Sequence, residues 1–223
     1  IILIANTGDN STQSSIERSL KVKAMGYDGL LLVVPYYNKP QQRGLIAHFT
    51  KIVDTVQMPS ILYNVPGRSS LNMETETLLA CAQNKYIVGV KEASHNDDQI
   101  KQIIKEAPKH FGIYCGNDDQ NQDCLEWGAH GIISVTGNVT PSILNQQSEL
   151  ALAHQLDHAR MIHEQLLPLH TALFIETNPV GVKEALNLMG KQVGGVRLPL
   201  VDMEDNHRLV LKDVLVKQAL VEA

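Results

Sequence analysis

Short apolar runs alternate along the chain with longer segments in which apolar residues recur every three or four positions. The runs are five or six residues long and rich in aliphatic side chains, which predicts β-strands. They cover residues 1–5, 29–34, 60–65, 86–90, 111–115 and 131–135. Because the runs are continuously apolar rather than alternating, the pattern is typical of parallel strands that are covered on both faces.

The intervals between these runs carry helical periodicity and have the length of βα units. Helices are predicted over residues 12–25, 44–56, 73–83 and 97–105, with another around 124–125 that Gly128 ends. After residue 140 the strands stop, and long helical patterns cover residues 142–153, 156–174, 179–189 and 205–221. The pattern thus predicts a βα region over 1–140, followed by a helical region over 141–223.

Two architectures use repeated βα units, and the segment after the first strand helps to separate them. A doubly wound nucleotide-binding sheet carries a Gly-x-Gly-x-x-Gly turn there, which residues 6–10 lack. A barrel places its chemistry at the carboxyl ends of the strands. Polar residues follow each of the six apolar runs in this chain. The pattern therefore favours an α/β fold of the (β/α)8 TIM-barrel type that lacks two of its strands at the front.

Composition narrows the functional classes. The 223 residues are 43% hydrophobic, enough for a sizeable core, and the net charge is −5 without a Lys/Arg block, which argues against a nucleic-acid surface. No apolar stretch approaches the length of about 20 residues that spans a bilayer. The three cysteines lack metal-type spacing and suit a reducing, cytoplasmic compartment; they are Cys81, Cys115 and Cys124. No metal site is expected.

Lys91 is the strongest candidate for chemistry. It closes the apolar run 86–90 and is followed directly by Glu92. A lysine at the end of a buried strand is costly unless its charge is lost or paired. A neutral amine attacks carbonyl carbons, which is the chemistry of a Schiff-base enzyme. The alternative is a lysine that only marks the exit of the strand into solvent.

Aromatic and basic residues near other strand ends complete the candidate set. Tyr63 lies one strand earlier at a comparable depth, so parallel neighbours would bring it beside Lys91, where a phenol can relay protons. Arg68 follows in a turn, and its planar fork suits a carboxylate. Tyr36 and Tyr37 are adjacent, so at most one of them is expected to enter a given pocket. The plainer alternatives are a packed aromatic side chain for Tyr63 and a solvated arginine for Arg68.

Three motifs around these residues carry a family resemblance. They are Pro-Tyr-Tyr-Asn-Lys-Pro at 35–40, Leu-Tyr-Asn-Val-Pro-Gly-Arg at 62–68 and Gly-Val-Lys-Glu-Ala-Ser at 89–94. Their order and spacing resemble the pyruvate-dependent class I aldolases, the family of N-acetylneuraminate lyase. Within that family the chain is most similar to the dihydrodipicolinate synthases (4-hydroxy-tetrahydrodipicolinate synthases), from Ile1 to about Pro199. The run 65–68 favours the synthases over the sialic acid lyases.

The resemblance implies a role for each candidate. Lys91 would form the imine with pyruvate, and Tyr63 would relay protons above it. Tyr37 would reach across a tight dimer interface into the active site of the partner. Arg68 would hold the carboxylate of aspartate semialdehyde. The resemblance also implies residues that shape the pyruvate site and residues at a possible lysine effector site: Gly116 and Ile133 for the former, Asn10 and Tyr36 for the latter.

The implied reaction condenses pyruvate with aspartate semialdehyde, the entry step of diaminopimelate and lysine biosynthesis. The enamine carbon would attack the aldehyde, and the product would cyclise and lose water to give 4-hydroxy-tetrahydrodipicolinate. No metal or organic cofactor is needed, and a homotetramer built as a dimer of tight dimers is implied, with no nucleic-acid or membrane partner. Two alternatives stay open: another aldolase of the family that acts on sialic acid or a keto-deoxy sugar acid, and a catalytically silent subunit.

The family also carries a Gly-Thr-Thr-Gly-Glu motif after its second strand, whose threonines bind the pyruvate carboxylate. This motif does not occur in the 223 residues. The resemblance therefore predicts about 70 residues ahead of Ile1, which would supply the two missing βα units of the barrel. A polypeptide that truly began at Ile1 would leave two strand edges open and is expected to fold poorly and to show little activity.

Overall fold

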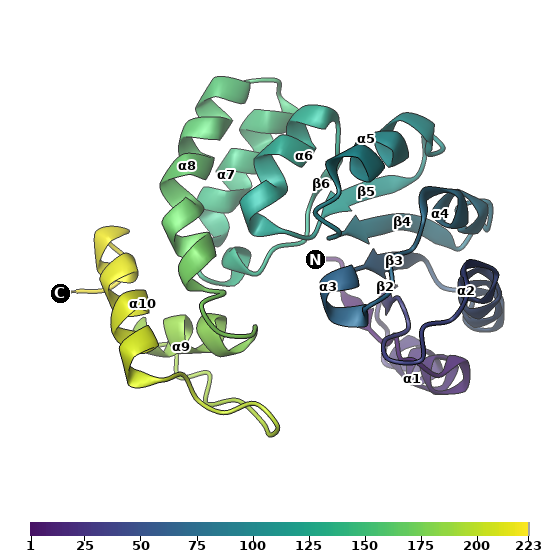
Figure 1. Ribbon diagram of the computed structural model, residues 1–223, viewed down its shortest axis with the longest axis horizontal. Coiled ribbons are helices and arrows are strands. Elements are labelled where there is room, and N and C mark those ends of the chain that lie inside the picture. The colour runs from purple at the N-terminus through teal and green to yellow at the C-terminus, as the bar shows by residue number, and fades with distance from the viewer. Residues whose placement is uncertain (223) are drawn as a thin grey trace. The chain divides into compact units, whose positions relative to one another are not determined.

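The structure is a computed structural model that describes residues 1–222. Six parallel strands lie side by side in the order in which they occur along the chain. Figure 1 shows that they form a curled sheet with helices along its outer side. The strands are β1 (Ile4–Asn6), β2 (Gly29–Val33), β3 (Ser60–Asn64), β4 (Ile87–Glu92), β5 (Gly112–Cys115) and β6 (Gly131–Ile132). This arrangement confirms the α/β class and the parallel sheet.

The sheet belongs to the first of two compact units, formed by residues 1–117 and 127–132. Its helices are α1 (Thr12–Ala24), α2 (Gln42–Val56), α3 (Pro66–Ser69), α4 (Thr75–Cys81) and α5 (Asp97–Glu106). Local sequence sets their ends. Ser11 caps α1 by accepting the Ser14 N–H at 3.3 Å, and Asn96 caps α5 by accepting the Gln99 N–H at 3.1 Å.

The two faces of this sheet differ in their surroundings. Register places Leu62, Val90 and Ile113 side by side on one face, where none of them is more than 2% exposed. This face meets the apolar sides of the helices and forms the core of the unit. The next residue of each strand points to the opposite face, so Tyr63, Lys91 and Tyr114 form a second row, which is only half-buried.

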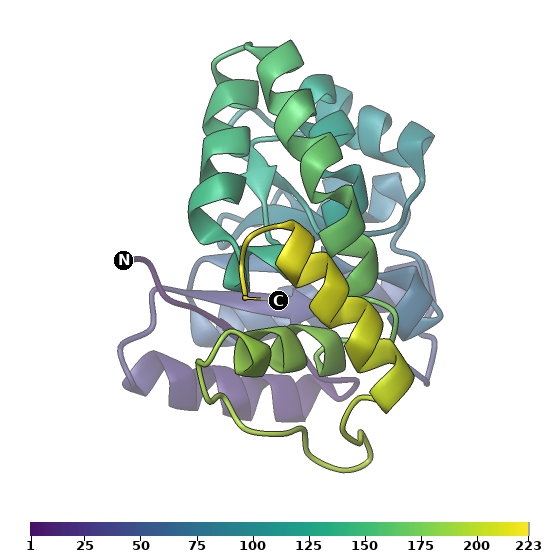
Figure 2. The ribbon, with the colours of Figure 1, turned by 90° about the vertical axis from the view of Figure 1, so that its left-hand side faces the viewer.

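The second unit contains residues 118–126 and the chain from Ile133 onward. Its elements are η1 (Asp118–Gln120), most of α6 (Asn121–Trp127), η2 (Thr136–Asn138), α7 (Pro141–Leu152), α8 (Leu156–Ala172), α9 (Val180–Leu188) and α10 (Asp205–Lys217). Helices α7 and α8 lie side by side, and α10 packs against α8 and α9 (Figure 2). Buried polar groups tie this unit together: Thr136 Oγ1 donates to Asp118 at 3.1 Å and lies 2.8 Å from His170 Nδ1.

Most elements follow the predicted pattern, and the differences have local causes. The strand predicted over 86–90 extends through Lys91 and Glu92, because Gly116 N–H donates to the Glu92 carbonyl at 2.8 Å. The run 131–135 forms a strand only at 131–132. There the backbone turns away, since the N–H groups of Val135 and Thr136 both donate to the Asp118 carboxylate at 2.9 Å.

Other predicted boundaries need smaller changes or stay predictions. The first strand begins at Ile4 rather than at the first residue, and Arg68 lies in the short helix α3 rather than in an open turn. The region boundary at residue 140 stays a prediction, and the predicted second region reaches Ala223, which lies outside the described residues. The segment predicted ahead of the first strand also stays a prediction. None of the helices in residues 1–222 has the length and hydropathy to cross a bilayer.

Candidate active site

Lys91 and Tyr63 face each other across neighbouring strands. They are paired in the β3–β4 register, and Lys91 Nζ lies 4.5 Å from the centre of the Tyr63 ring. Both are half-buried at the carboxyl ends of their strands. The predicted juxtaposition is confirmed: an amine and a phenol meet at the end of the sheet where parallel α/β folds place ligands.

The electrostatics of Tyr63 depend on its burial and on Arg68. Burial raises the pKa of the Tyr63 phenol above its ordinary value, and the positive charge of Arg68 opposes the shift. The short helix α3 begins with Pro66 at its first turn and carries Arg68 in its last turn, on the surface. Arg68 is therefore an exposed residue whose charge acts on the phenol beside Lys91.

Gly116 lies against the aliphatic part of Lys91. A Cβ atom at this position would come within 2.8 Å of Lys91 Cε and 2.9 Å of Ala93 Cβ. Only a glycine fits without displacing the lysine side chain. The structure therefore brings Lys91, Tyr63 and Gly116 together. Ile133, the first residue after β6, is half-buried in the second unit, and its role in the site stays a prediction.

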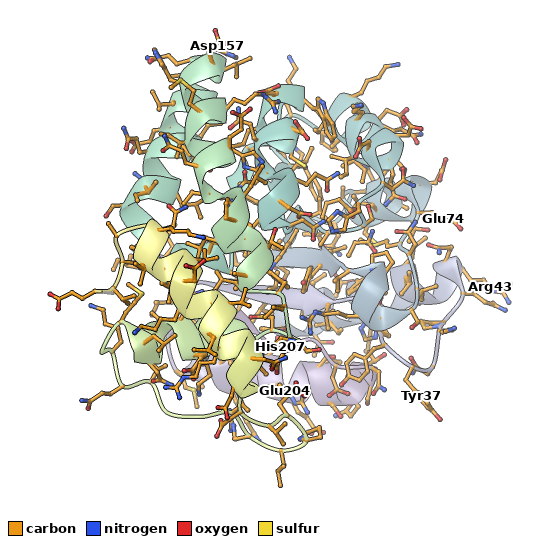
Figure 3. All side chains as sticks on the ribbon, turned by 60° about the vertical axis from the view of Figure 1, so that its left-hand side comes forward. Tyr37, Arg43, Glu74, Asp157, Glu204 and His207 are labelled. Atoms are coloured by element: carbon orange, nitrogen blue, oxygen red, sulfur yellow. The ribbon has the colours of Figure 1, made fainter. Side chains whose placement is uncertain are left out.

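Tyr36 and Tyr37 lie in a loop that Asn10 and Asn38 hold. Asn10 Nδ2 donates to the Tyr36 carbonyl at 3.2 Å, and Asn38 Nδ2 donates to the Asn10 carbonyl at 2.8 Å. Tyr37 has a φ of 73° and is 88% exposed, and Figure 3 shows its side chain pointing away from the ribbon. Its side chain therefore does not pack on the site of its own chain. Tyr36 is also exposed, at 40%, and the expectation that at most one of the two enters a given pocket stays a prediction.

A sequence model of the dihydrodipicolinate synthetase family matches residues 1–218 of the chain. The chain belongs to this family. A 4-hydroxy-tetrahydrodipicolinate synthase of Thermoanaerobacter sp. (strain X514) is 46% identical over 223 residues, which are 100% of this chain and 75% of the relative. Members of the dihydrodipicolinate synthetase family are enzymes, and the chain is one of them.

Solved structures from the same family agree. The chloride-inhibited dihydrodipicolinate synthase from Acinetobacter baumannii, complexed with pyruvate, is 37% identical with a TM-score of 0.96, and the match covers 99% of this chain and 76% of that one. The enzyme from Cyanidioschyzon merolae with lysine bound is 36% identical with a TM-score of 0.96, over 99% of this chain and 75% of that one. At these identities the likeness supports the family as well as the fold.

The three sequence motifs of this dihydrodipicolinate synthetase family member lie at the same end of one sheet. The segment 35–40 follows β2, the segment 62–68 spans the end of β3, and the segment 89–94 spans the end of β4. Neighbouring parallel strands place these ends next to each other, so residues far apart in sequence form one site. Arg68 lies on α3, shortly after β3, and its charge acts on Tyr63, while Gly116 directly follows β5 and lies beside Lys91.

A group of buried polar residues beneath this site was missed by sequence reasoning. Glu92 is 1% exposed and Asn64 is fully buried, and Asn64 Nδ2 lies 3.1 Å from each carboxylate oxygen of Glu92. Burial raises the pKa of Glu92, opposed by hydrogen bonds from Asn64, Ser94 and Gln99. One signal was available: each residue directly follows a candidate residue on its strand, so alternation turns both to the covered face.

Three kinds of polar group are the sequence-predicted candidates at this edge of the sheet. They are an amine, a phenol and a guanidinium, of which only the guanidinium is permanently charged. Across residues 1–222 no group of three or more His, Cys, Asp or Glu side chains is placed to hold a metal ion.

Proposed function

We propose that this enzyme condenses pyruvate with aspartate semialdehyde to form 4-hydroxy-tetrahydrodipicolinate, through a Schiff base on Lys91. One observation carries the proposal: an amine at a strand end, 4.5 Å from the centre of a tyrosine ring, in a chain of the dihydrodipicolinate synthetase family. The relatives that carry the synthase name, and the relative complexed with pyruvate, support the substrate assignment.

The first steps follow from the chemistry of amines and ketones. The neutral amine of Lys91 attacks the ketone carbon of pyruvate, and the carbinolamine loses water to give an iminium. Loss of a methyl proton converts the iminium to an enamine. Tyr63 is positioned to carry protons in these steps, because its hydroxyl-bearing ring faces the amine. No metal or organic cofactor takes part in this proposal.

The condensation then uses the second substrate. The enamine carbon attacks the aldehyde carbon of the semialdehyde and forms the new carbon–carbon bond. The amino group of the semialdehyde next attacks the imine carbon, closes the ring and displaces Lys91, which returns to the free amine. Overall one water is released for each pair of substrates. Arg68 binds the carboxylate of the semialdehyde, since an exposed guanidinium recognises it by paired hydrogen bonds.

Pyruvate itself is held near Gly116 and Ile133 in this proposal. Gly116 leaves room beside Lys91, because any side chain there would collide with the lysine methylenes. Ile133 keeps the role in shaping the pyruvate site that the family resemblance implies. Tyr37 is assigned to the active site of a partner subunit, which is consistent with its 88% exposure and with its outward direction.

Reduction of the imine tests this proposal directly. The full-length protein is incubated with pyruvate and borohydride, digested, and its peptides are weighed. We expect the mass of one reduced pyruvate adduct on the peptide that contains Lys91. Two other lysines serve as internal controls because they also lie over aromatic rings: Lys101 Nζ is 4.2 Å from the centre of Trp127, and Lys85 Nζ is 4.9 Å from that of Tyr86.

The outcomes separate the alternatives. Label on Lys91 alone supports the Schiff-base enzyme, whereas equal label on Lys101 or Lys85 would reduce the result to nonspecific amine chemistry and contradict it. No label at all supports a catalytically silent subunit. If the adduct forms but turnover requires a sugar acid instead of aspartate semialdehyde, the sialic acid or keto-deoxy sugar acid lyase assignment replaces ours.

We also propose the finer architecture and assembly. The six strands are strands three to eight of a (β/α)8 barrel, and residues 141–223 form the last barrel helix region and the C-terminal helical domain. The proposal is supported by the TM-scores of 0.96 to relatives of which the chain covers 75% and 76%. The enzyme is proposed to be a homotetramer of tight dimers. It is proposed to act in the cytoplasm, where its three buried cysteines suit reducing conditions.

Lysine is the proposed effector, at Asn10 and Tyr36. Support comes from the relative solved with lysine bound and from the hydrogen bond that joins Asn10 to the Tyr36 carbonyl at 3.2 Å. A ligand that contacts this pair would act next to Tyr37. Calorimetric titration with lysine checks the assignment: binding that Asn10→Ala weakens supports it, and equal binding by the variant contradicts it.

A further inference from the structure

Two residue pairs lie back to back at the ends of β3 and β4. The pair Tyr63 and Lys91 occupies one face, and the next pair in the same register, Asn64 and Glu92, occupies the other. The backbone also joins the pairs, because Ala93 N–H donates to the Asn64 carbonyl at 2.9 Å. Any shift of one strand end along the other therefore moves both pairs together.

The groups around the Glu92 carboxylate all donate to it. Asn64 Nδ2 approaches both oxygens at 3.1 Å, and the Ser94 N–H donates at 2.9 Å. A third donor is the Nε2 group of Gln99 on α5, at 3.5 Å. The carboxylate thus gathers hydrogen-bond donors from β3, from the segment after β4 and from α5.

A second layer of hydrogen bonds holds Asn64 in turn. Its Nδ2 donates to Asn72 Oδ1 at 2.8 Å, and its Oδ1 accepts from Met73 N–H at 2.9 Å. Asn72 Nδ2 donates to Gln99 Oε1 at 2.7 Å, which closes the network back to Gln99. We call Asn64, Asn72, Glu92 and Gln99 the amide–carboxylate cluster. Its members come from four separate segments of the first unit.

A cluster of this kind fixes geometry at some expense in stability. A buried carboxylate loses its hydration, and it is tolerated only where donors replace the lost water. The donors have defined directions, so a shift of one strand end leaves several buried polar groups without their hydrogen-bond partners. An apolar cluster of equal size would allow small shifts at little cost, because dispersion contacts have no such direction.

We propose that Glu92 and Asn64 are positioning residues for the reaction, which lock the register of β3 and β4 so that Tyr63 stays over the Lys91 amine. The inference rests on the proposed function, because it assumes that Lys91 is the nucleophile. Neither residue touches the substrate in this account. They act through the backbone of the two strand ends that carry the reacting side chains.

The Glu92→Gln variant tests whether the amide–carboxylate cluster holds the register of β3 and β4. The amide keeps the size of the side chain but places an NH2 group against the NH2 group of Asn64, so two donors face each other. We expect the rate of imine formation at saturating pyruvate to fall by about tenfold to a hundredfold, because small misplacements of reacting groups have effects of this size. The KM for pyruvate should change far less, since the groups that bind pyruvate are unchanged.

Gln147→Met is the matched control. Gln147 on α7 is also fully buried and donates to Asn121 Oδ1 at 2.9 Å and to Gln122 Oε1 at 3.1 Å, but it belongs to the second unit. The Gln147→Met substitution should lower the melting temperature without changing the rate of imine formation by more than about twofold. If Glu92→Gln loses no more of this rate than Gln147→Met, the proposal is overturned.

An exchange of partners separates positioning from a simple loss of stability. In the double variant Asn64→Asp with Glu92→Gln, a carboxylate again faces an amide, with their places exchanged. The carboxylate introduced on β3 would still accept the Met73 N–H, and the Asn72 amide, whose oxygen accepts from Asn64 in wild type, has to turn its NH2 group toward it. We expect the double variant to form the imine several times faster than Glu92→Gln alone. A double variant that forms the imine no faster contradicts the positioning role of Glu92 and Asn64. This comparison does not require the Asn64→Asp single variant to fold.

The wild-type protein separates a failure of this inference from a failure of the proposed function. If wild type forms no imine with pyruvate, the proposed function fails first. If wild type forms the imine at Lys91 and Glu92→Gln forms it at the same rate, only the positioning role fails.

Discussion

At the end of β4 two consecutive residues face opposite sides of the sheet and meet opposite surroundings. Lys91 is half-buried and faces the ring of Tyr63, with Gly116 leaving space against its methylenes. Glu92 is 1% exposed and is surrounded by amide and backbone donors. One face leaves its side chain partly exposed, and the other surrounds its side chain with hydrogen-bond donors.

This difference shows how a parallel sheet can combine reactivity with precision. A reacting lysine must move between amine, imine and enamine, so its surroundings cannot be close-packed. The strand beneath it must not move, because the rate depends on where the amine meets the carbonyl. Alternation along one strand assigns these two requirements to adjacent residues. The following predictions test each face, beginning with the largest expected effect.

Removal of the Tyr63 hydroxyl tests the proton carrier on the reactive face. Tyr63→Phe keeps a ring near Lys91 but removes the proton carrier, and we expect turnover to fall by about 10²- to 10⁴-fold. Tyr86→Phe is the control, because Tyr86 is half-buried and also lies under a lysine, with Lys85 Nζ at 4.9 Å. Steady-state kinetics measure both variants. If the Tyr63 variant keeps wild-type turnover, the phenol has no role as proton carrier.

Arg68 extends the reactive face toward solvent. Arg68→Ala should lower kcat/KM for aspartate semialdehyde by about tenfold to a hundredfold, the range that corresponds to loss of a charge-assisted hydrogen bond. The rate of imine formation with pyruvate should change little. Arg43→Ala is the control, because Arg43 is likewise an exposed arginine and lies at the edge of its unit in Figure 3. An equal loss in both variants would argue for a general charge effect instead.

Gly116 defines the space beside the lysine. In Gly116→Ala the new Cβ would come within 2.8 Å of Lys91 Cε, so the side chain must shift, and we expect the rate of imine formation to fall by about tenfold. In Gly137→Ala the nearest atom is an ordinary contact at 3.5 Å, and that variant should react normally. Borohydride quenching over time measures both rates. Equal rates would show that the absence of a side chain at Gly116 has no effect on imine formation.

On the covered face we expect a smaller effect, on how the stability of the protein depends on pH. Burial raises the pKa of Glu92 above 4.5, so the folded state binds this proton more tightly than the unfolded chain. Its contribution to stability is therefore present below the unfolded pKa and is lost as the pH rises through the raised folded pKa. Glu92→Gln lacks this dependence. As the pH falls from about 7 to about 5, the urea midpoint of wild type should therefore rise relative to that of Glu92→Gln.

Two buried histidines also make the stability depend on pH in that experiment. Burial lowers the pKa of His48 and His170 to about 4, so their contribution is present above the ordinary pKa of 6.5 and is lost as the pH falls through about 4. Wild type and Glu92→Gln share both histidines, so this loss cancels in the difference. A difference in midpoint that does not change with pH would contradict a raised pKa at Glu92.

Periodicity was enough to predict most of the elements and the position of the site. Apolar runs locate the strands, and the order of parallel strands places Lys91 beside Tyr63. The amide–carboxylate cluster could not be found in this way. Its hydrogen-bonded partners are separated by between 7 and 28 positions along the chain, and nothing in an asparagine or glutamine side chain indicates which partner it will meet.

The loop of Tyr37 shows a second limit. Adjacency predicts that at most one of the two tyrosines enters a given pocket, but it does not predict the positive φ of 73° at Tyr37. That φ occurs in a loop where hydrogen bonds join Asn10 to Tyr36 and Asn38, which only the folded backbone brings together. The early end of β6 is similar, because it depends on an aspartate that precedes the strand in sequence. Local patterns give the elements, and side-chain hydrogen bonds between distant segments decide these details.

The most direct test of the account compares two lysines that both lie over aromatic rings. Turnover of pyruvate and aspartate semialdehyde is measured for Lys91→Ala and Lys101→Ala in the full-length protein. We predict a loss of more than about a thousandfold for Lys91→Ala, because the covalent nucleophile is gone, and nearly unchanged turnover for Lys101→Ala. Wild-type turnover by a well-folded Lys91→Ala protein would contradict the Schiff-base mechanism.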